Sequence, residues 1–503
     1  MEAEGDREAG GAPWLQSTDA LLAPDRQLVL VVDHPHDPST TRPTGECRSE
    51  EVRTPSSTLQ SVSDVCVTPT APDEHSAVRD HPTTSNRFSA DTLCTREQVH
   101  VSNELAREYH GYADDVLRPI AHSALGHVTA SDGWESYRDV NERVASTIPE
   151  LVADDAVVWT TGYHFAPLSE LVRSRVSDET FLFHYWPDPW PAWDTLRVGP
   201  HVEATVEGLL SNDLLAFDSP RYCDNFLRAV GELFPAAGID RGAKQVVHDG
   251  TPTAIRSLPR GVSVDRVQHL AVSLTAERFV SRFRDTHGIA ADRPTVVALD
   301  RTEDTAGLAH CLGALEGLWA DDARKREAFT FVLCNDACRS RASDGHGVDG
   351  TVPRLVERIN RRFGTADWQP VVSHSTKPTD GERYALYRDA TVGVASSVHD
   401  SGIPETAEFV AAQSADPGVL LLSSRTETNN RFDEGALIFS PFDQQSFRNR
   451  LHEGLLLGPD ERRMWMASLR ERVRGYDDEA WLQYVDGTIT GIAQRRATGQ
   501  SST

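Results

Sequence analysis

The sequence predicts an α/β protein with two doubly wound parallel-sheet domains that face a central cleft. Short β-branched apolar runs alternate with segments of helical length, as strands and helices do in a parallel sheet. The alternation occurs in two series that meet near residue 271, and 503 residues suit two or three domains. Ligands of such folds bind beyond the carboxyl ends of the strands, so the cleft is the expected site.

The first series begins with an apolar run at residues 27–32, which predicts a buried strand. Later runs predict buried parallel strands at 157–160, 180–184, 214–217 and 245–248. Segments with helical periodicity separate them at 137–152, 200–211 and 222–234. We therefore expect a first domain over residues 26–270.

The second series starts near residue 273 and repeats the alternation. Its apolar runs predict strands at 295–299, 329–334, 391–395, 419–422 and 437–439. Its periodic segments predict helices at 305–318, 352–363, 404–413 and 445–456. We expect this second domain over residues 271–476.

Two segments lack either pattern. Residues 1–25 are polar and rich in Gly, Ala and Glu, and we expect them to be disordered. Residues 33–98 are rich in Pro, Ser, Thr and Asp, which predicts a long low-complexity insertion in the first domain.

The charge composition is strongly acidic. The formal net charge is -26, and the chain has three lysines against 47 arginines. This composition is typical of proteins from salt-loving archaea, where an acidic surface keeps proteins soluble and the Debye length falls to about 3 Å at 1 M salt. A surface that binds a basic partner is the alternative. No basic patch stands out, so nucleic-acid binding is not expected.

The seven cysteines form no Cys-x-x-Cys pair, and no His or Cys cluster completes a metal site. The odd count and the absence of a signal-peptide pattern favour reduced thiols and a cytoplasmic location. No apolar run approaches the roughly 18 residues of a membrane span. We therefore expect neither a metal nor a membrane.

A basic residue stands at one transition from strand to helix. Arg301 follows the predicted strand at 295–299 and precedes the predicted helix at 305–318. Helix N-termini and guanidinium groups both favour phosphate oxygens, so this turn is a candidate phosphate site.

Several motifs, in this order along the chain, resemble those of the trehalose-6-phosphate synthase family, glycosyltransferase family 20. They include residues 154–164 (DDAVVWTTGYH), 183–189 (FHYWPDP), 208–217 (GLLSNDLLAF), 358–364 (RINRRFG) and 400–408 (DSGIPETAE). The resemblance runs from about residue 101 to 486. It implies a GT-B fold of two Rossmann-like domains, with the final segment at 477–503 crossing back to the first domain as a helix.

The resemblance also implies an activity and its residues. Such enzymes transfer glucose, with retention, from a nucleoside-diphosphate glucose to glucose 6-phosphate, and they need no cofactor. The matching donor-site residues are Arg301, Asp400 and Glu408, with His184 near the donor glucose; of these, Arg301, His184 and Asp400 are the expected catalytic residues. The acceptor-site residues are Tyr109, Arg339 and Arg118. Register leaves Arg341 as an alternative to Arg339. Each of these residues also has an explanation without a ligand. The arginines can pair with surface acids, Glu408 can lie on a solvated helix face, and Tyr109 can pack in the core.

Some positions depart from the family pattern. Ala306 stands where the family has a diphosphate-binding lysine, Gly162 where it has an acceptor-binding aspartate, and Arg118 where it has an aromatic residue. Pro404 stands where a backbone amide of the family faces the diphosphate, and proline has no N–H to donate. His34 lies near the position of an early arginine of the family.

These departures leave three hypotheses open. In the first, the chain is an active glycosyltransferase related to trehalose-6-phosphate synthase, which makes the precursor of an osmolyte. In the second, it transfers another sugar onto a phosphorylated polyol. Alternatively, it is an impaired homologue that regulates or scaffolds, as a homo-oligomer or together with an active relative.

Overall fold

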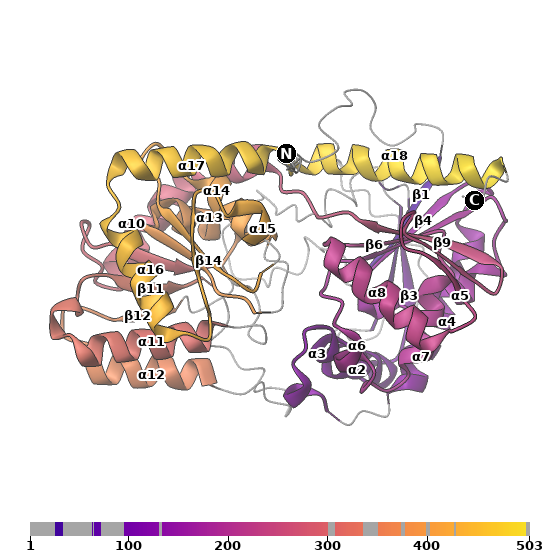
Figure 1. Cartoon of the computed structure of the whole chain (residues 1–503), viewed down its shortest axis with the longest axis horizontal. Helices are drawn as coiled ribbons and strands as arrows, with labels where there is room; N and C mark the ends of the chain where they lie inside the picture. Colours follow the sequence, from indigo (N-terminus) through magenta and orange to yellow (C-terminus); the bar gives the residue numbers. More distant parts are fainter. Residues whose placement is uncertain are drawn as a thin grey trace, which may run out of the picture. The chain divides into compact units, whose positions relative to one another are not determined.

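The computed structural model (Figure 1) describes residues 26–33, 63, 65–71, 95–129, 133–299, 307–334, 351–373, 378–398, 403–426 and 429–498. Segment 1–25, most of segment 33–98, and the predicted site residues Arg301, Arg339 and Asp400 lie outside these residues, as do Ala306 and His34. The chain divides into two compact units, each described below by itself. One comprises Ala20–Pro259 with Leu482–Thr503, and the other comprises Arg260–Trp481.

The N-terminal unit contains, in the described part, a nine-stranded sheet of order β3-β2-β1-β4-β5-β6-β9-β8-β7. Its strands are β1 (Leu28–Val31), β2 (Val65–Thr70), β3 (Thr95–His100), β4 (Val157–Thr161), β5 (Phe181–Trp186), β6 (Leu214–Phe217), β7 (Gly238–Asp240), β8 (Gln245–His248) and β9 (Thr251–Ser257). Its helices are α2 (Asn103–Tyr112), the π-helical η1 (Ala113–Leu117), α3 (Arg118–Ala121), α4 (Trp134–Thr147), α5 (Leu168–Arg173), α6 (Trp193–Leu196), α7 (Val202–Leu210) and α8 (Pro220–Leu233).

The predicted parallel strand at 245–248 is wrong in its direction. β8 pairs antiparallel with both β7 and β9. Asp249 and Gly250 alone join β8 to β9, and both have positive φ angles, of 47° and 81°. A two-residue Asp-Gly turn with positive φ at both positions closes a hairpin, so the sequence carried this signal at 249–250.

The prediction of one unpacked insertion at 33–98 is wrong for two strands. β2 pairs parallel with β1, and β3 pairs parallel with β2 at the edge of the sheet. Cys66 and Val67 of β2 are almost fully buried, whereas Val99 is the one buried residue of β3. β2 was hidden because its apolar run is short and Ser, Thr and Pro surround it, and β3 because its side chains are mostly exposed.

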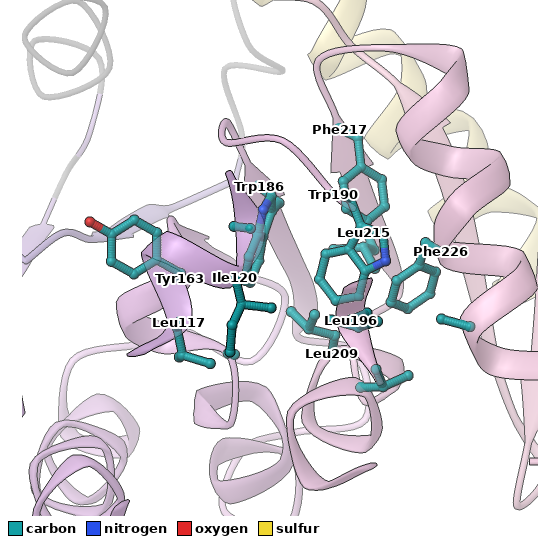
Figure 2. Close-up of a cluster of buried hydrophobic side chains, with 14 of the residues drawn as sticks. Leu117, Ile120, Tyr163, Trp186, Trp190, Leu196, Leu209, Leu215, Phe217 and Phe226 are labelled. Carbon is teal, nitrogen blue, oxygen red and sulfur yellow. The ribbon is translucent and has the colours of Figure 1, made fainter. Parts of the chain in front are cut away.

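Aromatic side chains fill the core beside the ends of β5 and β6 (Figure 2). The ring centroids of Trp186 and Trp190 lie 4.9 Å apart, and those of Trp190 and Phe226 lie 5.1 Å apart. α8 brings Phe226 to this core, and its N-terminus is capped by the Ser219 hydroxyl, which accepts from the Tyr222 N–H. The packed rings fix the strand ends that carry the candidate site.

The C-terminal unit contains a six-stranded sheet that is wholly parallel in the described part, with the order β12-β11-β10-β13-β14-β15. Its strands are β10 (Thr295–Ala298), β11 (Thr330–Leu333), β12 (Val371–Ser373), β13 (Val392–Ala395), β14 (Val419–Ser423) and β15 (Ala436–Phe439). Its helices are α9 (Val264–Ala271), α10 (Leu274–Thr286), α11 (Gly307–Asp321), α12 (Thr351–Phe363), α13 (Asp380–Asp389), α14 (Ile403–Ala412), α15 (Asn429–Phe432), α16 (Gln444–Leu456) and α17 (Pro459–Arg474).

Helices cover both faces of this second sheet. Val296 and Val297 are neighbours in β10, yet they enter two separate hydrophobic cores. Successive side chains of a strand point to opposite faces, so both faces are buried. This explains why the strands appear in the sequence as continuous apolar runs.

The last helix, α18 (Asp478–Ala497), packs on the N-terminal sheet from Leu482 on. Arg496 Nη1 lies 2.7 Å from Asp213 Oδ1. The other carboxylate oxygen of Asp213 accepts from Arg173 and from the Leu182 N–H of β5. One buried carboxylate therefore ties α18, α5 and β5 together. None of the described helices is long and apolar enough to span a membrane.

Gly307, at the start of α11, allows a close approach of two segments. A Cβ at this position would lie 2.0 Å from the backbone oxygen of Ser396, which follows β13. Real contacts of this kind are far longer, so any side chain would push α11 away from the sheet.

We expect Gly307→Ala to lower the free energy of unfolding by about 2–3 kcal/mol because the methyl group overpacks the Ser396 backbone. Gly313→Ala is the matched control in the same helix: its Cβ would meet only Gln444, at 3.5 Å, and should be neutral or stabilising by up to about 1 kcal/mol. Urea unfolding of both variants checks this. Equal midpoints for the two variants would contradict it.

Candidate active site

Polar side chains gather where the parallel strands of the N-terminal sheet end. Asp33 follows β1, residues 162–164 follow β4, Asp188 follows β5 and Asp218 follows β6. The carboxyl ends of parallel strands meet at one edge, which is where such folds bind ligands. This edge is therefore the candidate site of the N-terminal unit.

His184 lies on β5 and is fully buried. Its Nδ1 atom lies 2.7 Å from the Thr160 hydroxyl of β4, its register partner. Burial lowers the pKa of His184 to about 3, so the imidazole is neutral at physiological pH. Its Nε2 atom makes no hydrogen bond with the described residues. The side chain can thus offer a neutral donor or acceptor, but not a positive charge.

Tyr109 lies on α2 and is 1% exposed. Burial and then the Asp33 carboxylate raise the pKa of its hydroxyl well above the ordinary value, so it stays protonated. Its ring packs against those of Tyr137 and His164, with centroid distances of 5.9 Å and 5.7 Å. Tyr109 is therefore a core residue whose hydroxyl end lies near the charged group after β1.

Arg118 begins α3 and is half-buried. Its charge acts on Tyr163, whose hydroxyl donates to Asp114 Oδ1 at 2.9 Å. Burial raises the pKa of Tyr163 most, Asp114 and Asp188 raise it further, and Arg118 opposes them. The structure thus brings both Tyr109 and Arg118 near the segment after β4, Tyr109 beside His164 and Arg118 near Tyr163.

Two side chains of α4 bind the backbone of the segment at residues 162–164. The Tyr137 hydroxyl donates to the Tyr163 carbonyl at 2.6 Å, and Asn141 Nδ2 donates to the His164 carbonyl at 3.0 Å. Gly162 has φ 83° and ψ 169°, a region that only glycine adopts without strain. This conformation explains glycine at 162, where the family resemblance places an aspartate.

In the C-terminal unit, Glu408 lies in α14 and is 5% exposed. Its Oε1 atom accepts from Arg383 at 3.3 Å and from the Tyr384 hydroxyl at 3.1 Å. Arg383 also pairs with Asp380, at 2.9 Å. The carboxylate is therefore held rigidly, and it is not the solvated helix residue that an acidic protein would otherwise suggest.

Pro404 is the second residue of α14 and is buried. Proline suits the first turn of a helix because its missing N–H has no intrahelical partner there. The same lack means that residue 404 offers no backbone donor to an anion.

The sequence search missed several residues of the N-terminal edge: Asp33, His110, Asp114, Tyr163 and His164. They come from three separate stretches of the chain, so no single sequence motif contains them all. Two weaker signals existed. His110 and Asp114 share a helix-like i,i+4 spacing, and Asp33 and His164 each follow the end of a strand.

Because His184 is buried and neutral, it should make stability depend on pH. Below pH 6.5 the unfolded chain binds a proton on this residue, while the folded chain binds none until about pH 3. Stability should therefore fall as pH falls through this window, by up to about 1.4 kcal/mol per pH unit.

His184→Gln should remove this contribution, so its free energy of unfolding should fall less steeply than that of the wild type between pH 6.5 and about pH 5. His269→Gln, at an exposed histidine, should keep the wild-type slope. Denaturant unfolding at each pH measures both slopes, and identical slopes for wild type and His184→Gln would refute the assignment.

Comparisons with known proteins bear on the whole chain. A family model described as "Glycosyltransferase family 20" matches residues 55–490. The alpha,alpha-trehalose-phosphate synthase [UDP-forming] of Botryotinia fuckeliana is 25% identical over 413 residues, 80% of this chain and 77% of that protein. The Candida albicans protein of the same name is 26% identical over 382 residues, 74% and 78% of the two chains.

Solved structures resemble the fold. The E. coli protein bound with UDP-2-fluoro glucose matches with a TM-score of 0.77 and 19% identity, over 93% of this chain and 99% of that one. The alpha,alpha-trehalose 6-phosphate synthase of Burkholderia multivorans matches with a TM-score of 0.79 and 22% identity, over 95% and 99%. These matches confirm the predicted fold, two parallel-sheet α/β domains of the GT-B type. Because the family model matches residues 55–490, more than half of the chain, this chain belongs to glycosyltransferase family 20.

Proposed function

We propose that this chain is a retaining glucosyltransferase that moves glucose from UDP-glucose to glucose 6-phosphate or a related phosphorylated acceptor. The observation that carries this proposal is the family match over residues 55–490, with relatives named UDP-forming trehalose-phosphate synthases. The proposed product is a trehalose phosphate, which would serve osmolyte synthesis.

The proposed donor site uses Arg301, Asp400 and Glu408. A departing diphosphate needs cations, and the guanidinium group of Arg301 suits its oxygens. Glu408 would accept from ribose hydroxyls, and its contact with Arg383 supports this role because a fixed carboxylate loses little freedom on binding. Asp400 would orient hydroxyls of the donor glucose.

The proposed acceptor site uses Tyr109, Arg118 and Arg339. Tyr109 can donate one hydrogen bond because its hydroxyl stays protonated. Arg118 would add positive charge for a phosphate near the segment after β4. His184 would offer its Nε2 atom to a hydroxyl of the donor glucose, which would satisfy a buried atom that makes no hydrogen bond with described residues.

The alternative, an impaired regulatory or scaffolding homologue, has no observation that favours it over the synthase. The relatives that support the family assignment are named as enzymes. The substitutions at Gly162 and Pro404 have local structural reasons, given by a glycine-only backbone conformation and a helix first turn. That the protein forms an oligomer and that it is located in the cytoplasm are still predictions.

The acidic composition supports a further proposal, that the protein works at high salt. With a net charge of -26, like charges repel in the folded chain and salt screens them.

The synthase proposal is tested by mixing the full chain with UDP-glucose and glucose 6-phosphate at high salt and measuring UDP release. We expect turnover with this pair. Glu408→Gln should lower kcat/KM by roughly 10- to 150-fold, as expected for one lost charged hydrogen bond. Glu461→Gln, at an exposed glutamate of the same unit, should keep the wild-type rate.

Thermal unfolding of both variants shows whether Glu408→Gln still folds. No turnover with UDP-, GDP- or ADP-glucose, combined with calorimetric binding of a nucleotide, would reject the synthase and favour the impaired homologue.

Raising KCl from about 0.2 M to about 2 M should raise the unfolding temperature by several degrees because repulsion between acidic groups is screened. Calorimetric scans at matched pH measure the shift. An unfolding temperature that stays constant or falls would count against adaptation to high salt.

A further inference from the structure

Two histidines and two aspartates converge at the carboxyl edge of the N-terminal sheet. Asp33 Oδ2 lies 3.7 Å from His110 Nδ1 and 3.5 Å from His164 Nε2. Asp114 reaches the same two rings, with Oδ2 at 3.9 Å from His110 Nδ1 and Oδ1 at 3.6 Å from His164 Nε2. Two imidazole nitrogens thus face two carboxylates around one point.

These separations suit a tetrahedral metal ion. Zinc binds imidazole nitrogen and carboxylate oxygen at about 2.0–2.1 Å, which places neighbouring ligand atoms about 3.3–3.4 Å apart. The distances from Asp33 Oδ2 to the two imidazole nitrogens, 3.7 Å and 3.5 Å, exceed this by a few tenths of an ångström. One ligand atom from each of Asp33, His110 and His164 lies within 4.8 Å of the other two, so small side-chain rotations would close these three around an ion. Asp114, with one oxygen near each ring, would supply the fourth ligand.

The surroundings already orient these ligands. Asp114 accepts from the Tyr163 hydroxyl at 2.9 Å. The His164 ring stacks on Tyr163, with centroids 4.4 Å apart, and Asn141 holds its backbone carbonyl. Supporting contacts of this kind fix ligand orientation in metal sites.

Burial and exposure also fit a metal site. The side chains of Asp33 and His164 are 8% and 14% exposed, while those of Asp114 and His110 are 23% and 34% exposed. The His164 Nε2 atom makes no hydrogen bond with the described residues. The cluster thus has a buried side and a side open to an entering ion, and its His164 Nε2 atom lies within ion-pair distance of two carboxylates without a hydrogen bond to either.

We propose that Asp33, His110, Asp114 and His164 bind one divalent transition-metal ion, with Zn²⁺ as the best fit. Imidazole nitrogen suits zinc and its neighbours in the first transition row, and two carboxylates balance the charge of the ion. The sequence had given no reason to expect a metal, because the four ligands come from three distant stretches of the chain.

The ion would also neutralise the negative charge of this edge. Without it, Asp33 and Asp114 present negative charge beside Tyr109, which would oppose an anionic acceptor. With it, the two carboxylates would be balanced, so the edge would no longer oppose a phosphate group. This consequence rests on the proposed function, whereas metal binding does not.

The test is a calorimetric titration of Zn²⁺ into the metal-stripped full chain without any sugar or nucleotide, with the bound zinc counted by elemental analysis after gel filtration. We expect one tightly bound equivalent per chain. His164→Gln and Asp33→Asn should each weaken binding tenfold or more. His248→Gln is the matched control, since its side chain is 17% exposed against 14% for His164 and lies on β8, outside the cluster.

Circular dichroism and thermal unfolding of each variant show that it is folded, and His110→Gln replaces any variant that is not. No bound zinc in the wild type would overturn the proposal and leave histidine–aspartate ion pairs as the meaning of the cluster. Equal zinc binding by wild type and His164→Gln would also overturn it, because the zinc would then be held elsewhere, for example by cysteines. Since no substrate is present, neither result bears on glucosyl transfer.

Discussion

The parallel pairing of β1, β4 and β5 is the constraint on which the N-terminal site depends. Val31 pairs with Thr160, and Thr160 pairs with His184, so the three strands end within two residues of the same level. Residues that are far apart along the chain therefore emerge together at one edge. Any shift in this register would separate Asp33 from the segment after β4, and a slip of one residue would turn His184 to the opposite face of the sheet.

Around this edge, buried aromatic side chains set the electrostatics. Tyr109 and Tyr163 stay protonated because burial and nearby carboxylates both disfavour their charged forms. His184 stays neutral for the same reason of burial. The formal charges near these rings include those of Asp33, Asp114 and Arg118, and their sum affects how strongly an anionic ligand binds. In the C-terminal unit, a buried hydrogen bond from Arg383 fixes the carboxylate of Glu408.

The sequence predicted the elements whose side chains are buried on both faces. Strands such as β10 and β14 appear as continuous apolar runs because helices cover both sides of their sheet. β3 could not be found in this way because it lies at an edge with one buried residue. β8 was found but given the wrong direction, since the Asp249–Gly250 turn was not weighed against the apolar pattern.

The site was predictable only where a family motif carries it. Tyr109, His184 and Glu408 could be named from motifs, but their burial and partners could not, because these depend on the packing of separate helices. The cluster of Asp33, His110, Asp114 and His164 has no local spacing beyond one i,i+4 pair. Only the fold brings it together.

The most direct test of the account is an NMR analysis of the product formed from UDP-glucose labelled with ¹³C at C1 and unlabelled glucose 6-phosphate. Retaining transfer predicts one new labelled anomeric signal with α configuration, in a disaccharide that still carries phosphate. A labelled signal from free glucose alone, or a product with β configuration, would contradict it.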